Sequence, residues 1–133
     1  MILGVADTHT AIWYLFDDKR LSGTAGEFID QAAVAGGRIA VSSITLAEIV
    51  YLLEKNRLLA NVYIDLRAAL ADPEHVFKEC HLTVDVVEAM RRVARSDVPD
   101  MPDRIVAATV VYLNVPVISR DGRIRAASVQ TIW

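Results

Sequence analysis

Short apolar runs alternate with longer amphipathic stretches along this chain, and this alternation limits the possible folds more than any other feature. The runs at 2–6, 38–42 and 115–119 are five residues long and mostly apolar, as is typical of strands buried on both faces. Stretches with helical spacing of apolar side chains lie between them. Strands that alternate with helices form parallel sheets covered on both faces. The sequence therefore predicts an open α/β fold with a central parallel sheet.

Capping and turn residues set the boundaries of the expected elements. A helix within 21–37 can begin at Ser22 or Thr24, and Gly36-Gly37 is typical of its end. Pro102 favours the first turn of a later helix. The expected strands are at 2–6, 38–42, 76–83, 115–119 and 129–133. A first helix is expected after residue 7 and a second within 21–37. Four more are expected at about 43–56, 60–71, 84–95 and 103–113.

Composition limits the class of protein. The chain has 133 residues, of which 53% are hydrophobic, so we expect a single domain over 1–133 with a buried core. Its longest apolar run, 105–113, is about half of the roughly 20 residues needed to span a membrane. Cys80 is the only cysteine, and no secretory signal is visible, so we expect a cytoplasmic protein without a membrane anchor.

Four acidic residues stand where a parallel sheet would bring them to one edge. Asp7 follows the first strand and Asp121 follows the strand at 115–119. Glu48 lies one to two turns into the helix after 38–42, and Asp103 begins the helix that leads into 115–119. Ligands of open parallel sheets bind beyond the carboxyl ends of the strands. Crowded carboxylates repel one another unless a cation lies among them, and Mg²⁺ and Mn²⁺ prefer oxygen ligands. We therefore predict a Mg²⁺ or Mn²⁺ site.

Each acid also has an ordinary structural explanation. Asp7 can cap the following helix, and Thr45 and Glu48 have the spacing of a capping box. Asp103 in a first helical turn complements the helix dipole, and Asp121-Gly122 is a common turn pair. The expected convergence of all four acids at one edge favours the metal site over four unrelated caps and turns.

Arginine is concentrated near the end of the chain. Residues 91–133 contain seven arginines and four acidic residues, although the net charge of the whole chain is −3. The planar guanidinium fork suits phosphate, and a bound divalent ion can activate water against a phosphodiester. The candidates for phosphate contacts are Arg104, Arg120, Arg123 and Arg125, of which Arg104 could equally pair with a neighbouring acid.

Four segments resemble the motifs of PIN-domain ribonucleases, in particular VapC-type toxins of bacterial toxin–antitoxin modules. They read ADTHTAIWYL, SSITLAEIVYLLEKNR, DMPDRIVAATVVYLNVPVISRDGRI and a terminal IW. The resemblance covers nearly the whole chain and implies a PIN-like three-layer α/β/α fold with a central parallel sheet. It places Asp7, Glu48, Asp103 and Asp121 on the acidic positions at which the family binds Mg²⁺ or Mn²⁺ and carries out catalysis.

The resemblance also implies a function and partners. It implies hydrolysis of RNA phosphodiester bonds, a homodimer, and a cognate antitoxin whose tail crosses an apolar groove and blocks the active site. Ser119 falls where the family commonly has a small hydroxyl residue, so we expect it to contact substrate. The third motif departs from the family's His-x-Asp-Pro-Phe-Asp-Arg at Val98, Met101 and Pro102 but keeps Asp103-Arg104.

Two other functions fit parts of the sequence. Asp7 could be the nucleophile of a haloacid-dehalogenase-like phosphatase, although that signature has a second Asp two residues later, where this chain has His9. A non-catalytic PIN-like binding module would suit the negative net charge and the high hydrophobic content. Assays of metal-dependent RNA cleavage and of turnover of a small phosphomonoester distinguish the ribonuclease, the phosphatase and the binding module.

Overall fold

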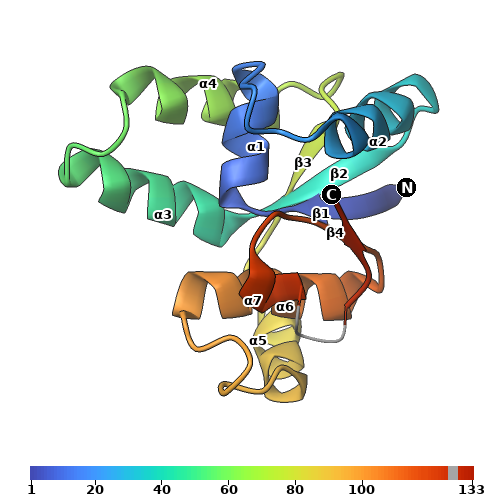
Figure 1. The fold of residues 1–133 in the computed structure, drawn as a ribbon, viewed down its shortest axis with the longest axis vertical. Helices are drawn as coiled ribbons and strands as arrows, with labels where there is room; N and C mark the ends of the chain where they lie inside the picture. Colours follow the sequence, from blue (N-terminus) through green and yellow to red (C-terminus); the bar gives the residue numbers. More distant parts are fainter. Residues whose placement is uncertain (126–128) are drawn as a thin grey trace.

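The computed structural model describes residues 1–125 and 129–133, and within them it has one five-stranded parallel sheet in the order β3-β2-β1-β4-β5 (Figure 1). The strands are β1 (Ile2–Ala6), β2 (Arg38–Ser42), β3 (Phe77–Cys80), β4 (Val117–Ile118) and β5 (Thr131–Ile132). The helices are α1 (Thr8–Leu15), α2 (Gly23–Val34), α3 (Ser43–Glu54), α4 (Ala60–Ala71), α5 (Val84–Ala89), the 3₁₀ helix η1 (Met90–Arg92), α6 (Met101–Leu113) and α7 (Gly122–Arg125).

Helices cover both faces of the sheet, which confirms the expected three-layer α/β/α arrangement. Figure 1 shows α1, α2 and α4 on one side of the sheet, and α5, α6 and α7 on the other. Successive strand residues point to opposite faces. In β1, Ala6 accordingly packs in the cluster that contains Ile29 of α2, whereas Val5 packs with Val106 and Val110 of α6. Both faces of the central strand are therefore buried in apolar cores.

Helix ends largely follow the capping residues that the sequence predicts. The Ser22 hydroxyl accepts a hydrogen bond from the Ala25 N–H at 3.1 Å and caps α2, and Gly36 follows that helix with a φ of +75° that favours glycine. Pro102 lies in the first turn of α6. This helix has 13 residues, and none of the helices in the described ranges has the length and apolar character to cross a membrane.

The strand order reverses between β1 and β4, because the chain builds outward from β1 to β2 and β3 on one side and to β4 and β5 on the other. Ala6 pairs with Ile118 at the carboxyl ends of these two strands, and the Asp7 N–H donates to the Ile118 carbonyl at 3.3 Å. Such a reversal leaves a crevice beyond the strand ends, where open parallel sheets bind ligands.

The helix predicted at 84–95 instead divides into α5 and η1. The Arg104 Nε donates to the Val93 carbonyl at 3.0 Å, and its Nη2 donates to the Met90 carbonyl at 3.0 Å. A side chain from α6 thus satisfies carbonyl groups that a continuing helix would have bonded internally. The α-helical part is shorter than expected because a tertiary contact, which local spacing does not reveal, replaces its last turn.

Candidate active site

A cleft of about 510 Å³ lies at the edge of the sheet where the strand order reverses. The structure brings all four acidic residues singled out from the sequence to this one cleft, although two lie within α3 and α6 and two lie directly before α1 and α7. The residues that line it are Asp7, Thr8, His9, Trp13, Arg20, Glu48, Asp100, Asp103, Arg120, Asp121 and Arg123.

Asp7 is buried at the end of β1, with 7% of its surface exposed. Its Oδ1 accepts from the Thr10 N–H at 2.9 Å and caps α1, so the expected cap exists. Its Oδ2 accepts from the Ser119 hydroxyl. Because each carboxylate oxygen has two lone pairs, these two hydrogen bonds orient Asp7 and still leave both oxygens able to bind a cation. The cap and the metal ligand are therefore compatible roles for one side chain.

Ser119 lies between two of the four acids at the edge of the sheet. Its side chain is fully buried, and its hydroxyl donates to Asp7 while it accepts from the Asp121 N–H at 2.9 Å. These two hydrogen bonds join the two acids and hold them at adjacent strand ends. A contact between Ser119 and substrate stays a prediction.

Asp121 begins a short helix instead of a simple turn. Its Oδ1 accepts from the Arg123 N–H at 2.8 Å and from the Ile124 N–H at 3.4 Å, which is the bonding of a helix cap. Ile124 is fully buried in the cluster beneath α6 and anchors α7 from below. The cap and the anchor together fix the Asp121 carboxylate at the cleft.

Glu48 is held by a threonine that sequence reasoning missed. The Thr8 hydroxyl donates to the Glu48 Oε1 at 2.6 Å and lies 3.0 Å from the Thr45 hydroxyl. The capping-box interpretation of Thr45 and Glu48 is wrong, because Ser42 caps α3 and accepts from the Ile44 N–H at 3.2 Å. The only sequence signal for Thr8 is a hydroxyl directly after an acid at the end of a buried strand.

Asp103 is a partly buried acid that lies near other carboxylates of the cleft. It lies in the first turn of α6, and its N–H donates to the Asp100 Oδ2, which caps this helix, at 3.2 Å. Burial, followed by the carboxylates of Asp100 and Asp121, raises the pKa of Asp103 to about 7, and Glu48 acts in the same direction. The negative charge in the cleft is therefore not balanced by its own surroundings.

No ion pair relieves this charge within residues 1–125 and 129–133. The ion pairs found there join Arg20 to Asp18, His81 to Glu79 and Arg91 to Glu88, and none of these three acids lines the cleft. The oxygen-rich donor set suits Mg²⁺ or Mn²⁺. In the same ranges, no three acidic, His or Cys side chains form a ready-made metal-binding group. The chemistry and the charge of these acids thus fit a hard cation, and their side chains would have to move closer together to bind it.

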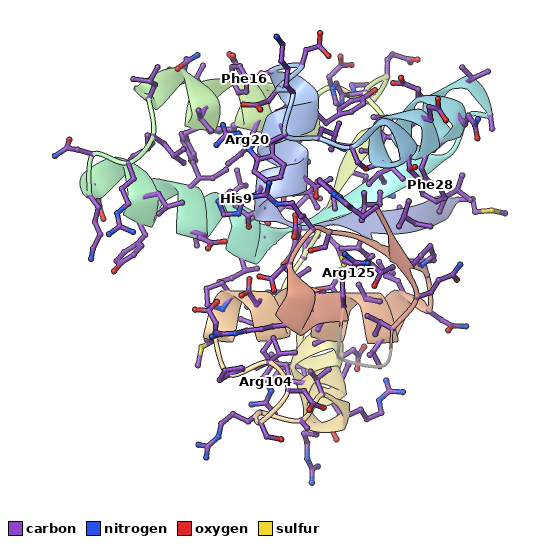
Figure 2. The ribbon with its side chains drawn as sticks, viewed as in Figure 1. His9, Phe16, Arg20, Phe28, Arg104 and Arg125 are labelled. Carbon is purple, nitrogen blue, oxygen red and sulfur yellow. The ribbon has the colours of Figure 1, made fainter. Side chains whose placement is uncertain are left out.

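The four arginines expected to contact phosphate divide into two pairs. Arg120 and Arg123 line the cleft, whereas Arg104 and Arg125 do not. The Arg104 guanidinium is bonded to backbone carbonyls between α6 and η1, and Figure 2 shows it across the sheet from His9. Arg125, the last residue of α7, is exposed outside the cleft. Only Arg120 and Arg123 therefore remain candidates for contacts beside the acids.

Arg20 also lines the cleft, and no sequence motif indicated it. It follows α1 in a loop and lies 5.1 Å from the centre of the Trp13 ring. Figure 2 shows Arg20 and His9 on the same side of the molecule, next to α1. Nothing in the spacing of Arg20 relates it to Asp7, because the approach depends on how α1 packs on the sheet.

The fold and the cleft together define the class: an α/β/α domain with acids gathered where its parallel sheet reverses order. The sequence matches the family model for the PIN domain over residues 5–129, and the chain belongs to the PIN-domain family. This confirms the family resemblance of the sequence motifs. No curated protein sequence matches the chain at a significant level.

Solved structures with a similar fold include three bacterial complexes. VapBC2 from Rickettsia felis, bound to a DNA fragment from its promoter, has a TM-score of 0.70 at 13% identity, covering 98% of this chain and 97% of that chain. A toxin–antitoxin complex from Klebsiella pneumoniae has a TM-score of 0.63 at 22% identity, covering 98% and 96%. FitAcB from Neisseria gonorrhoeae has a TM-score of 0.52 at 20% identity, covering 97% and 96%. At these identities the likeness shows a shared fold.

Proposed function

We propose that this protein is a Mg²⁺- or Mn²⁺-dependent endoribonuclease of the VapC type, the toxin of a toxin–antitoxin module. One observation carries the proposal: Asp7, Glu48, Asp103 and Asp121 come from four segments and line one cleft without an ion-pairing cation among the described residues. Membership of the PIN-domain family supports nuclease chemistry. The fold shared with toxin–antitoxin complexes supports the toxin role.

The chemistry assigns a role to each acid. A Mg²⁺ or Mn²⁺ ion held by Asp7, Asp103 and Asp121 would supply a water molecule of lowered pKa and would neutralise charge on a phosphodiester. Glu48, oriented by its hydrogen bond from Thr8, completes the ligand set or directs the attacking water. Ser119 keeps Asp7 and Asp121 in register, so the two acids present their oxygens to the cleft from adjacent strands.

The proposal includes partners and a location. RNA is the substrate, a cognate antitoxin is the inhibitor, the toxin is a homodimer, and all of them act in the cytoplasm. Exposed apolar side chains on α3 and α4 support protein partners: Tyr51 is 54% exposed and Ile64 is 62% exposed. The acidic cleft would also attract a basic residue from an inhibitor.

The variant Asp7→Asn tests the reaction. Asparagine keeps the size of the side chain and an oxygen to cap α1, but it removes the charge that a divalent ion needs. We expect the wild-type protein to cleave cellular RNA in Mg²⁺ or Mn²⁺ and not in a chelator, and we expect the variant to fall to background. Cleavage is measured on total RNA by gel and by mapping of the new ends.

The same assay separates the alternatives. Circular dichroism should show that the Asp7→Asn variant is folded, and the variant also serves as a control for contaminating ribonuclease. Equal RNA cleavage by both proteins contradicts the assignment. Turnover of p-nitrophenyl phosphate without RNA cleavage favours the phosphatase, and absence of both activities favours the binding module.

A further inference from the structure

Trp13 also lines the cleft, and cationic and aromatic side chains gather around its ring. Trp13 is buried on α1, with 4% of its surface exposed. The Arg120 guanidinium lies over its ring at 4.6 Å from the ring centre, and Arg20 lies at 5.1 Å. The rings of Trp133 and His9 lie 6.0 Å and 5.6 Å from the same ring. Two cations are therefore held on one aromatic platform at the cleft.

Arg20 and Arg120 differ in what their N–H groups bind. Arg20 donates to both carboxylate oxygens of Asp18, from Nε at 3.0 Å and from Nη2 at 2.7 Å. Arg120 makes no ion pair in the part of the chain that the structure describes. A guanidinium that lies over a ring uses its face, and its N–H donors remain in the guanidinium plane. Arg120 is thus positioned by Trp13 and still has donors for an external anion.

The position of Arg120 is tied to the acids by the backbone. It directly follows Ser119, whose hydroxyl joins Asp7 to Asp121, and it directly precedes Asp121. A chain that enters the cleft would therefore contact the acids and the Arg120 guanidinium side by side. Polynucleotides carry one charge at each linkage, so a strand with one phosphate among the acids presents its neighbours nearby.

We propose that Arg120, held on Trp13, is a phosphate-binding subsite that contacts an RNA linkage next to the one being cleaved. The inference rests on the proposed ribonuclease function and adds the path of the RNA strand beside the acids. A phosphate fits better than a nucleobase, because Trp13 is buried and Arg20 and Arg120 lie against it, so no open aromatic face is left for stacking. The guanidinium fork and a phosphate are complementary in charge and shape.

Binding of an uncleavable strand tests the subsite without relying on turnover. The probe is a mixed-sequence ten-nucleotide 2′-O-methyl RNA, titrated in a chelator at several salt concentrations. The chain has two tryptophans, Trp13 and Trp133, and both lie in this cluster, so intrinsic fluorescence reports on it directly. We expect Arg120→Gln to weaken binding about five- to tenfold and to reduce the slope of log affinity against log salt by about 0.7, the share of one single-strand phosphate.

Two further variants define the outcomes. Arg67→Gln removes an exposed charge on α4, outside the cleft, and should leave affinity and slope unchanged. Arg120→Lys keeps the charge and should restore most of the salt slope, which a merely structural role would not do. If Arg120→Gln binds like Arg67→Gln while wild-type protein still cleaves RNA, the subsite is wrong and the ribonuclease stands. If binding depends on Arg120 but Mg²⁺ and Mn²⁺ support no cleavage, the subsite stands and the ribonuclease is wrong.

Discussion

At the scale of single residues, Asp103 makes the cleft sensitive to pH. Its pKa is raised from 3.8 to about 7 by burial and by neighbouring carboxylates. An acid with a higher pKa in the folded state than in the unfolded state holds its proton more tightly when folded. Its stabilising contribution is therefore complete below about pH 4 and is lost as the pH rises toward 7. Above that range Asp103 is ionised in the folded protein and is repelled by the neighbouring carboxylates.

The variant Asp103→Asn should remove this pH dependence. We expect it to increase the free energy of unfolding of the metal-free protein at about pH 8 by about 1 to 2 kcal/mol, after allowance for solvent screening. Near pH 4 the difference from wild type should be small. Urea denaturation in a chelator at both pH values measures it. A variant that is destabilised equally at both values would show that Asp103 is not under electrostatic strain.

The four acids of the site could be predicted from the sequence, whereas Thr8 and Arg20, which lie beside them in the cleft, could not. The four acids could be placed at one edge because each follows or begins an element whose end is readable from apolar runs and caps. The hydrogen bond from Thr8 to Glu48 spans 40 positions in the chain, and Arg20 meets Trp13 only through the packing of a loop. Such partners depend on three-dimensional contact, and no local pattern in the sequence encodes it.

At the scale of secondary-structure elements, the junction of α5, η1 and α6 depends on Arg104. The sequence offered this arginine as a phosphate ligand, whereas the structure uses it to bond the Met90 and Val93 carbonyls. Arg104 is only partly exposed, so these hydrogen bonds are sheltered from water. Hydrogen bonds from a charged donor of this kind stabilise a fold by about 1.5 to 3 kcal/mol.

The variant Arg104→Gln distinguishes these two roles. We expect it to lower the free energy of unfolding by about 1.5 kcal/mol, because at least one carbonyl loses its charged donor. We also expect RNA binding by the folded variant to keep the wild-type salt slope. Chemical denaturation and salt titration of the uncleavable RNA measure the two quantities. If the stability were unchanged and the salt slope were reduced, Arg104 would bind the phosphates of the substrate and would not stabilise the fold.

Local signals predicted most of the elements, and the deviations lie mainly at the ends of elements. β1, β2 and α4 match their expected ranges because buried apolar runs and the Asp72-Pro73 stop define them clearly. β4 has two residues where five were expected, and α7 was taken for a turn. Next to β4, the Pro116 carbonyl still accepts from the Val5 N–H at 2.9 Å and the Ser119 N–H donates to the Ile132 carbonyl at 3.3 Å. The Asp121 carboxylate then caps α7, which a turn prediction does not include.

At the scale of the whole molecule, the proposed metal site would join segments that are far apart in the sequence. Asp7, Glu48, Asp103 and Asp121 belong to segments spread from the first strand to the last turn before α7. An ion that binds them together connects both helical layers and the sheet. Any ligand that binds only the folded state raises its stability according to its concentration and affinity.

We therefore expect Mn²⁺ to stabilise the protein against heat and urea at about pH 8. At a hundredfold excess over the dissociation constant, the gain is about 2.7 kcal/mol, and a chelator should reverse it. The variant Asp121→Asn should lose most of this gain, whereas Asp65→Asn, which changes an exposed acid on α4 outside the cleft, should keep it. Differential scanning calorimetry with and without Mn²⁺ measures the shift. An equal shift in both variants would show that the ion binds elsewhere.

The two hydrogen bonds that the Asp7 carboxylate accepts have an evolutionary consequence. One oxygen caps α1 and the other accepts from the Ser119 hydroxyl. An asparagine in the same place would keep the capping oxygen, its NH₂ group would donate to the Ser119 oxygen, and the charge would be lost. A single codon change would then remove the proposed activity and keep the fold. Descendants of such a chain would keep the exposed apolar side chains of α3 and α4 for a protein partner, while their cleft would carry one negative charge less.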